Sequence, residues 1–164
     1  MSDKDEVFLT FERISWFADL KKEHLKKIAT ISHVLQFKSG DRFFHEGDRQ
    51  DNIYILTAGR VALDMFVPHH GKMRISTIER GEILGWSSVT PSIHQRTAGA
   101  VAVLDGEALV MEAESLRQLC EEDHDLGYLI MCQLSDAVAS RLMETRLQLL
   151  DMFGEPAETE NAQE

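Results

Sequence analysis

Six glycine-containing turns divide residues 32 to 111 into short runs of β-forming residues, and this spacing constrains the fold more than any other feature. The turns lie at Ser39-Gly40-Asp41, Glu46-Gly47-Asp48, Ala58-Gly59-Arg60, His70-Gly71-Lys72, Arg80-Gly81-Glu82 and Asp105-Gly106-Glu107. Glycine is the residue that most readily takes the backbone angles of a tight turn. Short strands at such intervals are typical of a β-sandwich or β-barrel.

Apolar residues alternate with polar ones inside these runs, which is the pattern of strands that bury one face. The residues that we expect to point inward are Ile53, Ile55, Val61, Leu63, Ile75, Ile78, Val101, Val103, Leu109 and Met111. We assign all of them to the core.

Helical periodicity replaces this alternation at both ends of the chain. Between residues 8 and 31, apolar residues recur every three or four positions with lysines among them, which predicts two short amphipathic helices. From Ser115 to Phe153 the pattern predicts a short helix and then a long one that Asp125 would cap. The fold class is therefore α+β.

The long helix carries an apolar stripe over several turns. Its members are Leu126, Leu129, Ile130, Leu134, Val138, Leu142 and Leu149. Since the helix is longer than one small barrel needs to cover itself, the stripe is either a core face or a surface for a homodimer or protein partner. The sequence leaves both alternatives open.

Composition argues against several functions. The formal net charge of −11 does not suit direct contact with nucleic acid, which needs a clustered basic surface. No apolar segment is long enough to span a bilayer, so we expect a cytoplasmic protein without membrane contact. Cys120 and Cys132 are expected to be buried thiols, neither disulfide-bonded nor catalytic. His69 and His70 lack further ligands at suitable spacing, so we expect no metal site.

One stretch combines residue types that suit a small molecule with hydroxyls and a phosphate. It runs from Gly81 to Ser88 as Gly-Glu-Ile-Leu-Gly-Trp-Ser-Ser and resumes, after a short insert, at Arg96-Thr97-Ala98. A carboxylate such as that of Glu82 only accepts hydrogen bonds, which suits a sugar hydroxyl, whereas a guanidinium donates in a planar fork that matches two phosphate oxygens. These features indicate a nucleotide sensor.

The order of helices, glycine-punctuated strands and long helix resembles the cyclic nucleotide-binding domain found in catabolite activator protein, in cyclic-nucleotide-dependent kinases and in gated channels. Five segments in the same order carry the resemblance: 37–41, 45–48, 53–61, 81–82 and 96–98. It covers residues 8–153. It implies an antiparallel β-roll, a jelly-roll-like double-stranded β-helix, with N-terminal helices and a long C-terminal helix.

The resemblance also implies roles for individual residues. Glu82 would accept a hydrogen bond from the ribose 2′-hydroxyl of cAMP or cGMP, and Arg96 would bind the cyclic phosphate. The remaining ligand-binding residues would be Gly85, Trp86, Ser87, Ser88 and Thr97, with Trp86 either stacking on the purine or closing the end of a core. The domain would be a regulatory module without enzymatic activity that signals through its long helix.

Two departures from the family pattern keep alternatives open. Gly85 lies one position later than the family's small residue, and residues 90–95 lengthen the interval between Glu82 and Arg96. Glu82 and Arg96 would then form an ion pair on a roll that has lost its ligand and serves as a ligand-independent interaction protein. A cupin-like metalloenzyme is less favoured, because no second histidine lies two positions from His45.

The chain divides into three parts on this reading. Residues 1–7 form an N-terminal extension, residues 8–153 the cyclic nucleotide-binding-like domain and residues 154–164 an acidic tail that we expect to be disordered. In the family's transcription factors a helix-turn-helix domain follows the long helix. Since a short acidic segment follows Phe153 here, we expect a stand-alone module.

Overall fold

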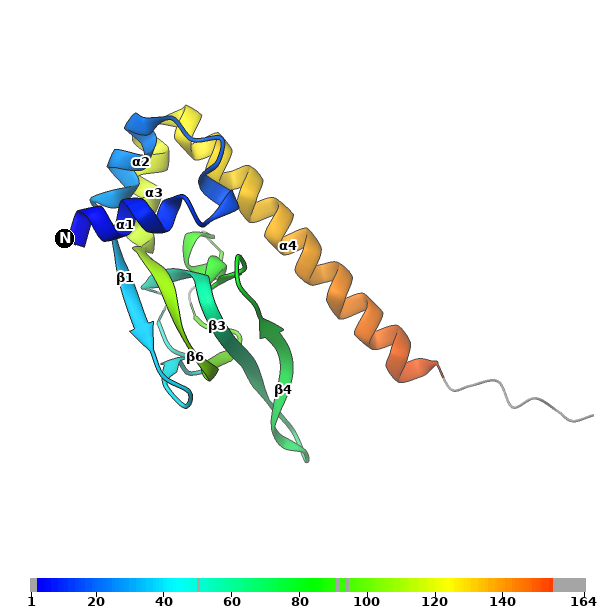
Figure 1. Cartoon of the computed structure of the whole chain (residues 1–164). Coiled ribbons are helices and arrows are strands. Elements are labelled where there is room, and N and C mark those ends of the chain that lie inside the picture. Colours follow the sequence, from blue (N-terminus) through cyan, green and yellow to red (C-terminus); the bar gives the residue numbers. More distant parts are fainter. Residues whose placement is uncertain (1–2, 50, 91, 94, 155–164) are drawn as a thin grey trace, which may run out of the picture.

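The structure is a computed structural model that describes residues 3–49, 51–90, 92–93 and 95–154. A group of helices covers one end of a β-roll, and a long C-terminal helix runs past the roll (Figure 1). The helices are α1 (Asp3–Phe11), α2 (Lys22–Ala29), α3 (Ala113–Glu122) and α4 (His124–Phe153), with the 3-10 helices η1 (Ser15–Phe17) and η2 (Trp86–Val89). The strands are β1 (Ser32–Phe37), β2 (Arg42–Phe44), β3 (Asn52–Val67), β4 (Gly71–Ile78), β5 (Ile83–Leu84) and β6 (Gly99–Glu112).

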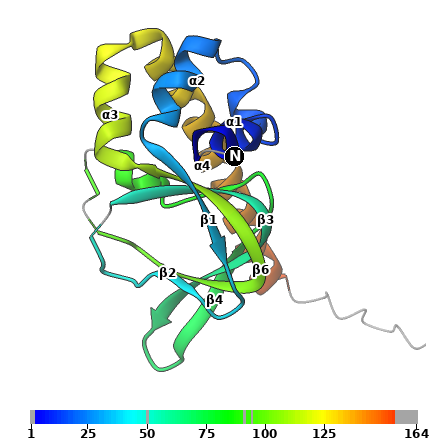
Figure 2. The ribbon, with the colours of Figure 1, turned by 60° about the vertical axis from the view of Figure 1, so that its left-hand side comes forward.

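The two longest strands, β3 and β6, form the centre of the sheet. They pair antiparallel from Asn52 opposite Glu112 to Asp64 opposite Gly99. Strands β1 and β2 pair with β6, and β4 and β5 pair with β3, so the sheet order is β1-β6-β3-β4 with β2 and β5 off this path. Figure 2 shows β1, β6 and β3 side by side below the helices. The α+β fold with an antiparallel β-roll is confirmed.

Two of the six expected turns are wrong, because Gly59 and Gly106 lie inside continuous strands. Gly59 has a φ of +85° at a register shift of β3. A Cβ on Gly59 would meet the Cα of Gly106 at 2.7 Å, and one on Gly106 would meet the carbonyl oxygen of Ala58 at 2.2 Å. These glycines let two strands approach closely and bend together without ending either one.

The core consists of two clusters. One fills the roll and includes Leu56, Val61, Ile78 and Val110, whereas the other joins the end of the roll to the helices through residues such as Ile28. The expected inner face is correct for six residues, each at most 1% exposed: Ile53, Ile55, Val61, Ile78, Leu109 and Met111.

The expected alternation is wrong in the first half of β6, where Val101 and Val103 are only half-buried. Ala100 and Ala102 point inward instead and are 0% and 2% exposed. Aromatic side chains occupy the roll interior at this end, in edge contacts such as that between Phe43 and Tyr54. Small alanines therefore suit the inner face of β6.

The N-terminal helix crosses the boundary that was expected at residue 8. Helix α1 begins at Asp3, and the side chain of Val7 is 1% exposed within the core. The structure thus gives no break between residues 7 and 8. Of the expected acidic tail, residues 155–164 lie outside the described part of the chain.

Helix α4 has 30 residues, and only its first part packs into the core. Leu126, Ile130 and Leu134 are buried, whereas Leu142 is 48% exposed. The helix cap differs from the expectation, because the carboxylate of Asp123, and not that of Asp125, accepts a hydrogen bond from the backbone N–H of Leu126. No helix in the described residues is both long and apolar enough to cross a membrane.

Candidate functional site

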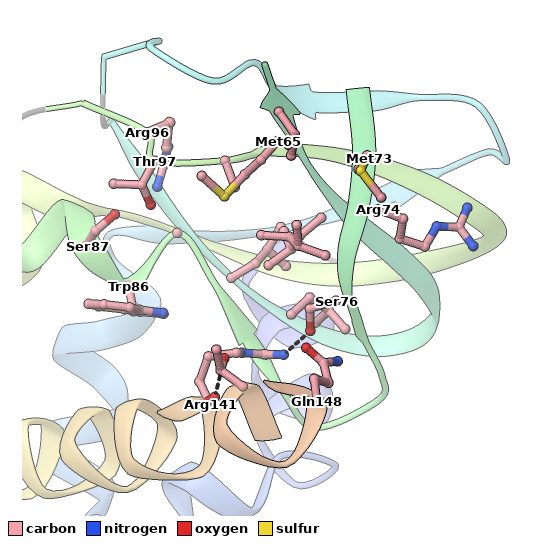
Figure 3. A pocket seen from close by; sticks show the side chains of 18 of the residues that line it. Met65, Met73, Arg74, Ser76, Trp86, Ser87, Arg96, Thr97, Arg141 and Gln148 are labelled. Atoms are coloured by element: carbon pink, nitrogen blue, oxygen red, sulfur yellow. Dashed lines mark hydrogen bonds between the residues drawn. The ribbon is translucent and has the colours of Figure 1, made fainter. Parts of the chain in front are cut away.

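A pocket of about 910 Å³ separates the roll from the second half of α4. Its walls come from strands β3 and β4, the segment from Ile83 to Ser87, the segment from Arg96 to Ala98, and α4 between Arg141 and Met152. Figure 3 shows Arg96, Thr97, Trp86 and Ser87 on the side of the roll and Arg141 and Gln148 on α4. The pocket thus brings together parts of the chain that lie far apart in sequence.

The backbone of Arg96 is fixed by the turn around Gly47. The N–H of Gly47 donates to the carbonyl of Arg96 at 2.8 Å, and the N–H of Arg96 donates to the carbonyl of Asp48 at 2.9 Å. Gly47 has a φ of +87°, which glycine adopts without strain. The carboxylate of Asp48 closes the same turn by accepting from the N–H of His45 at 2.7 Å. This glycine turn therefore orients the arginine.

The guanidinium of Arg96 is buried with most of its donors unused. Its residue exposure is only 4%, and one nitrogen, Nη2, donates to the carbonyl of Asn52 at 2.6 Å. The Nε and Nη1 atoms are buried and have no hydrogen-bond partner among the residues that the structure describes. The guanidinium carbon lies 4.2 Å from the centre of the Phe44 ring, a cation–π contact.

The charge of Arg96 is not matched by a carboxylate among the described residues. Burial lowers the pKa of Arg96, while Tyr54, Asp51 and Asp48 act in the opposite direction from a distance. An arginine nevertheless stays protonated in a protein. A buried and unpaired cation is costly unless another charge approaches it. The site therefore favours an anion.

Gly85 allows the guanidinium to lie against the backbone. Its φ is +78°, and a Cβ built on it would meet Nη1 of Arg96 at 2.6 Å. Ser87 and Thr97 line the same pocket. Ser88 does not, because its hydroxyl is buried and donates to the carbonyl of Asn52 at 3.2 Å. Ser88 thus supports the carbonyl that also accepts from Arg96.

Trp86 lines two pockets and belongs partly to the core. It contributes to the wall of the large pocket and to that of a smaller one of about 210 Å³, which Trp16 and Gln133 also line. The indole is half-buried and packs against the core cluster that joins roll and helices. Both roles considered for this tryptophan, contact with a ligand and closure of a core, are therefore compatible with its place.

The structure places Glu82 outside the wall of the large pocket. Its carboxylate accepts a hydrogen bond from the backbone N–H of Glu79 at 2.6 Å and lies 3.8 Å from Nη2 of Arg141. The alternative in which Glu82 and Arg96 form an ion pair is wrong, since the carboxylate pairs with a residue of α4. The structure brings together five of the seven expected site residues, namely Gly85, Trp86, Ser87, Arg96 and Thr97.

Sequence analysis missed the α4 side of the pocket. Arg141 donates to the hydroxyl of Ser76 at 2.6 Å and to the carboxylate of Glu144 at 3.1 Å, so it connects α4 to strand β4. Gln148 lies one turn of helix beyond Thr145 on the same wall. Helical spacing alone shows that such residues share a face, but it does not show what that face meets.

The pocket is basic although the chain is acidic. Among the described residues that line it are three arginines, Arg74, Arg96 and Arg141, and one carboxylate, that of Asp151. Such a local charge attracts an anion despite the formal net charge of −11.

Other reactive groups do not form a second site in the described residues. No three His, Cys, Asp or Glu residues are placed there to hold a metal ion. Cys120 and Cys132 are half-buried free thiols. Burial raises the pKa of Cys120 to about 11, so this thiol is a poor nucleophile at neutral pH.

Comparison with known proteins identifies the fold and its family. The family model of the cyclic nucleotide-binding domain matches residues 34–123. The cAMP-activated global transcriptional regulator CRP of Salmonella typhimurium is 25% identical over 132 residues, which are 77% of this chain and 61% of the regulator. The cGMP-dependent protein kinase 2 of Mus musculus is 28% identical over 118 residues, which are 70% of this chain and 15% of the kinase.

Solved structures agree with this result. The crystal structure of a cyclic nucleotide-binding domain from Methylobacillus flagellatus has a TM-score of 0.76 and 23% identity and covers 93% of this chain and 86% of its own. That similarity shows the fold. The matches span about three fifths of the regulator and 15% of the kinase, so this chain is similar to only one part of each protein. The family match covers more than half of the chain, which therefore belongs to the cyclic nucleotide-binding domain family.

Proposed function

We propose that this chain is a regulatory module that binds cAMP or cGMP in the pocket between the β-roll and α4. The observation that carries this proposal is the buried guanidinium of Arg96, whose Nε and Nη1 atoms lack partners within the described part of the chain. A cyclic phosphate brings a negative charge and two oxygens that accept hydrogen bonds, which matches a guanidinium with two free donors. The family membership supports the same ligand class.

The shape of the pocket supports a ligand of this size. Its volume of about 910 Å³ lies within the range of about 300–1,000 Å³ for small-molecule sites. Apolar side chains form most of the wall, and polar groups gather at Arg96 and at Arg141. A nucleotide, with its phosphate on Arg96 and its base toward α4, would use both polar regions and the apolar surface between them.

Isothermal titration calorimetry with cAMP and with cGMP tests this proposal. We expect one of them to bind the wild-type protein and Arg96→Met to lose at least tenfold in affinity, because the charge-assisted hydrogen bonds to phosphate disappear. Arg60→Met is the matched control, since Arg60 also lies on the roll but forms a half-exposed pair with Glu79 outside the pocket. Binding of neither nucleotide would contradict the proposal and favour the ligand-independent interaction protein.

The signal would leave the pocket through α4. Beyond Leu134 this helix is held to the roll by polar contacts of Arg141 with Ser76 and Glu82, while the pocket separates the remaining surfaces. A ligand that contacts both walls would stabilise one position of the helix relative to the roll. Only such a difference in affinity between two positions can shift the helix.

The outer side of α4 would receive the partner, and we take this partner to be a second copy. The residues that line the pocket, such as Arg141, Thr145 and Gln148, recur every three or four positions on the inner side. The outer side carries an apolar stripe with the same spacing, and its members Met143, Leu147 and Leu150 are 56%, 54% and 66% exposed. Exposed apolar residues at helical spacing are typical of an interface between helices.

The cytoplasm remains the proposed location, and the module is proposed to be non-enzymatic. Both cysteines are free thiols, which agrees with a reducing compartment. The polar groups of the pocket are suited to binding an anion, and the proposed function needs no bond to be broken.

A further inference from the structure

We infer that the pocket recognises one anionic group and a flat apolar body and that Glu82 accepts no hydrogen bond from a sugar hydroxyl of the ligand. The ligand class is thus wider than the ribonucleotides: any singly charged anion with a planar apolar body of suitable size qualifies. This inference rests on the proposed role of Arg96 as the anion site, but not on the identity of the nucleotide.

The first step concerns the carboxylate that a ribose hydroxyl would need. Both oxygens of Glu82 are engaged at the edge of the roll: one accepts from the N–H of Glu79 at 2.6 Å and the other lies 3.8 Å from Arg141. The turn that holds Glu82 in place runs from Glu79 to Glu82 and contains Gly81, whose φ is +85° and whose N–H donates to the carbonyl of Leu56 at 2.7 Å. Glu82 thus lines the two smaller pockets beside the large one and does not belong to the wall of the large pocket.

The second step concerns what lies next to the anion site instead. Gly85 leaves room for the guanidinium of Arg96, which a Cβ at this position would meet at 2.6 Å, and the next residue in the chain is Trp86, which lines the pocket. An indole presents an apolar face and a single N–H donor, so it cannot accept a hydrogen bond from a sugar hydroxyl as a carboxylate does. Of the described residues in the wall, Asp151 in the last turn of α4 alone carries a carboxylate.

The third step concerns the remaining walls. Strands β3 and β4 contribute the apolar side chains Leu63, Met65, Met73 and Ile75, and Figure 3 shows Met65 and Met73 on these strands. Methionine adapts its shape and makes favourable contacts between sulfur and aromatic rings. Together with Trp86, these side chains suit a flat aromatic body better than a hydroxylated ring.

The test compares cAMP and cGMP with their 2′-deoxy forms on the wild-type protein and on Glu82→Gln, by calorimetry. A hydroxyl bound by a carboxylate would make the 2′-deoxy ligand at least about tenfold weaker. We expect a difference of less than threefold, and the same ratio in Glu82→Gln. If this variant weakens both forms equally through its contact with Arg141, the inference stands. A 2′-deoxy ligand that binds more than threefold more weakly than its parent overturns the inference and leaves the proposed function intact.

A second probe covers the case in which no nucleotide binds. Naphthalene-1-sulfonate is a singly charged anion with a flat apolar body and no hydroxyl. If it binds and Arg96→Met loses at least tenfold in its affinity, the inference stands although the nucleotide proposal fails. If it binds equally to both proteins, or not at all, and no nucleotide binds, both the inference and the proposed function are overturned.

Discussion

Nη1 of Arg96 lies so close to Gly85 that a Cβ on this glycine would meet it at 2.6 Å. The glycine therefore has two separate reasons to be a glycine, since its φ of +78° is also unfavourable for other residues. One reason is local to the backbone, whereas the other depends on the position of the anion-binding side chain.

Replacing Gly85 with Ala should displace the guanidinium and weaken anion binding at least tenfold. The backbone penalty at positive φ is about 1–2 kcal/mol, and the contact with Arg96 adds to it. Gly81→Ala is a matched control, because Gly81 has a φ of +85° but, apart from its chain neighbours, no described residue has an atom within 4 Å of its Cβ position. Both variants should lose stability in urea unfolding, and only Gly85→Ala should lose affinity in calorimetry. Equal affinities would show that Gly85 does not position Arg96.

Because Arg96 is a buried charge without a carboxylate partner among the described residues, Arg96→Met should lose little stability. The substitution removes a hydrogen bond to Asn52 and a contact with Phe44, but it also removes the cost of two buried donors that lack partners. We expect the melting temperature without ligand to fall by no more than about 4 °C, which is roughly 1 kcal/mol for a chain of this size. The gain on adding ligand at one hundred times its Kd, about 2.7 kcal/mol in the wild type, should vanish.

Arg42→Met is the comparison for that experiment. Arg42 pairs with the buried carboxylate of Asp64 at 3.1 Å, so its removal leaves a buried charge unpaired. Such a loss costs about 3–5 kcal/mol when the pair is fully buried, and somewhat less here because Arg42 is 25% exposed. If Arg96→Met proves as destabilising as Arg42→Met, then Arg96 has a structural role and does not serve to bind an anion.

The sequence predicts the glycine turns of the roll because each turn, such as the one around Gly47, is specified by its own residues. The contact between this turn and Arg96 joins distant residues, so only the motif Arg96-Thr97-Ala98 indicates the arginine in the sequence. The position of Glu82 could not be predicted in the same way. It depends on Arg141, which lies far along the chain, as well as on the nearby backbone N–H of Glu79, so neighbouring residues alone do not specify where the carboxylate points.

For a similar reason, the sequence does not predict which of the alternating residues of β6 point into the roll. Valine has the higher β-propensity and alternates correctly, which made Val101 and Val103 the natural choice for the inner face. The aromatic side chains of other strands occupy the roll at this end, so Ala100 and Ala102 point inward. Packing against residues distant in sequence therefore decides which face of β6 points inward. The close approach of β3 likewise explains why Gly106 lies inside a strand and not in a turn.

The polar contacts of Arg141 should control the mobility of the second half of α4. Arg141→Ala removes the hydrogen bond to Ser76 and the contact with Glu82, so the backbone amides of residues 142–153 should exchange with deuterium faster. Arg146→Ala is the control, because Arg146 is exposed on the same helix and does not line the pocket. Unchanged exchange in Arg141→Ala would mean that other contacts hold the helix to the roll.

The capping carboxylate of Asp123 should make stability depend on pH. Its pKa lies below the usual 3.8, first because the ammonium of Lys27 donates to it at 2.6 Å and then because the N–H of Leu126 donates to it. A lowered pKa in the folded state stabilises the protein above the unfolded-state pKa, and this contribution is lost as pH falls through the folded-state value.

The wild type should therefore be more stable than Asp123→Asn from pH 7 to about 5, and the difference should shrink as pH falls below 3.8. Lys27, whose pKa is raised by the same hydrogen bond, keeps its charge up to and beyond pH 10.5, so the difference persists at mildly alkaline pH. Urea midpoints across this range measure it, with the exposed Asp19→Asn as control. A difference as large at pH 3 as at pH 7 would contradict the assigned contacts.

Helix α4 should hold two copies together through its outer apolar stripe. Met143, Leu147 and Leu150 face away from the pocket and are more than half exposed, so a single chain leaves this apolar surface in water. Sedimentation velocity at about 100 µM, a concentration high enough to populate a weak dimer, tests this interface. The wild type should sediment as a dimer, and the double variant Leu147→Glu with Leu150→Glu should sediment as a monomer. Glutamate is a good helix former, so the double variant keeps its helix.

Phe66→Glu is the control for the dimer experiment, because Phe66 on β3 is a comparably exposed apolar residue, at 64%. It should leave the dimer unchanged, and a wild type that sediments only as a monomer would refute this interface.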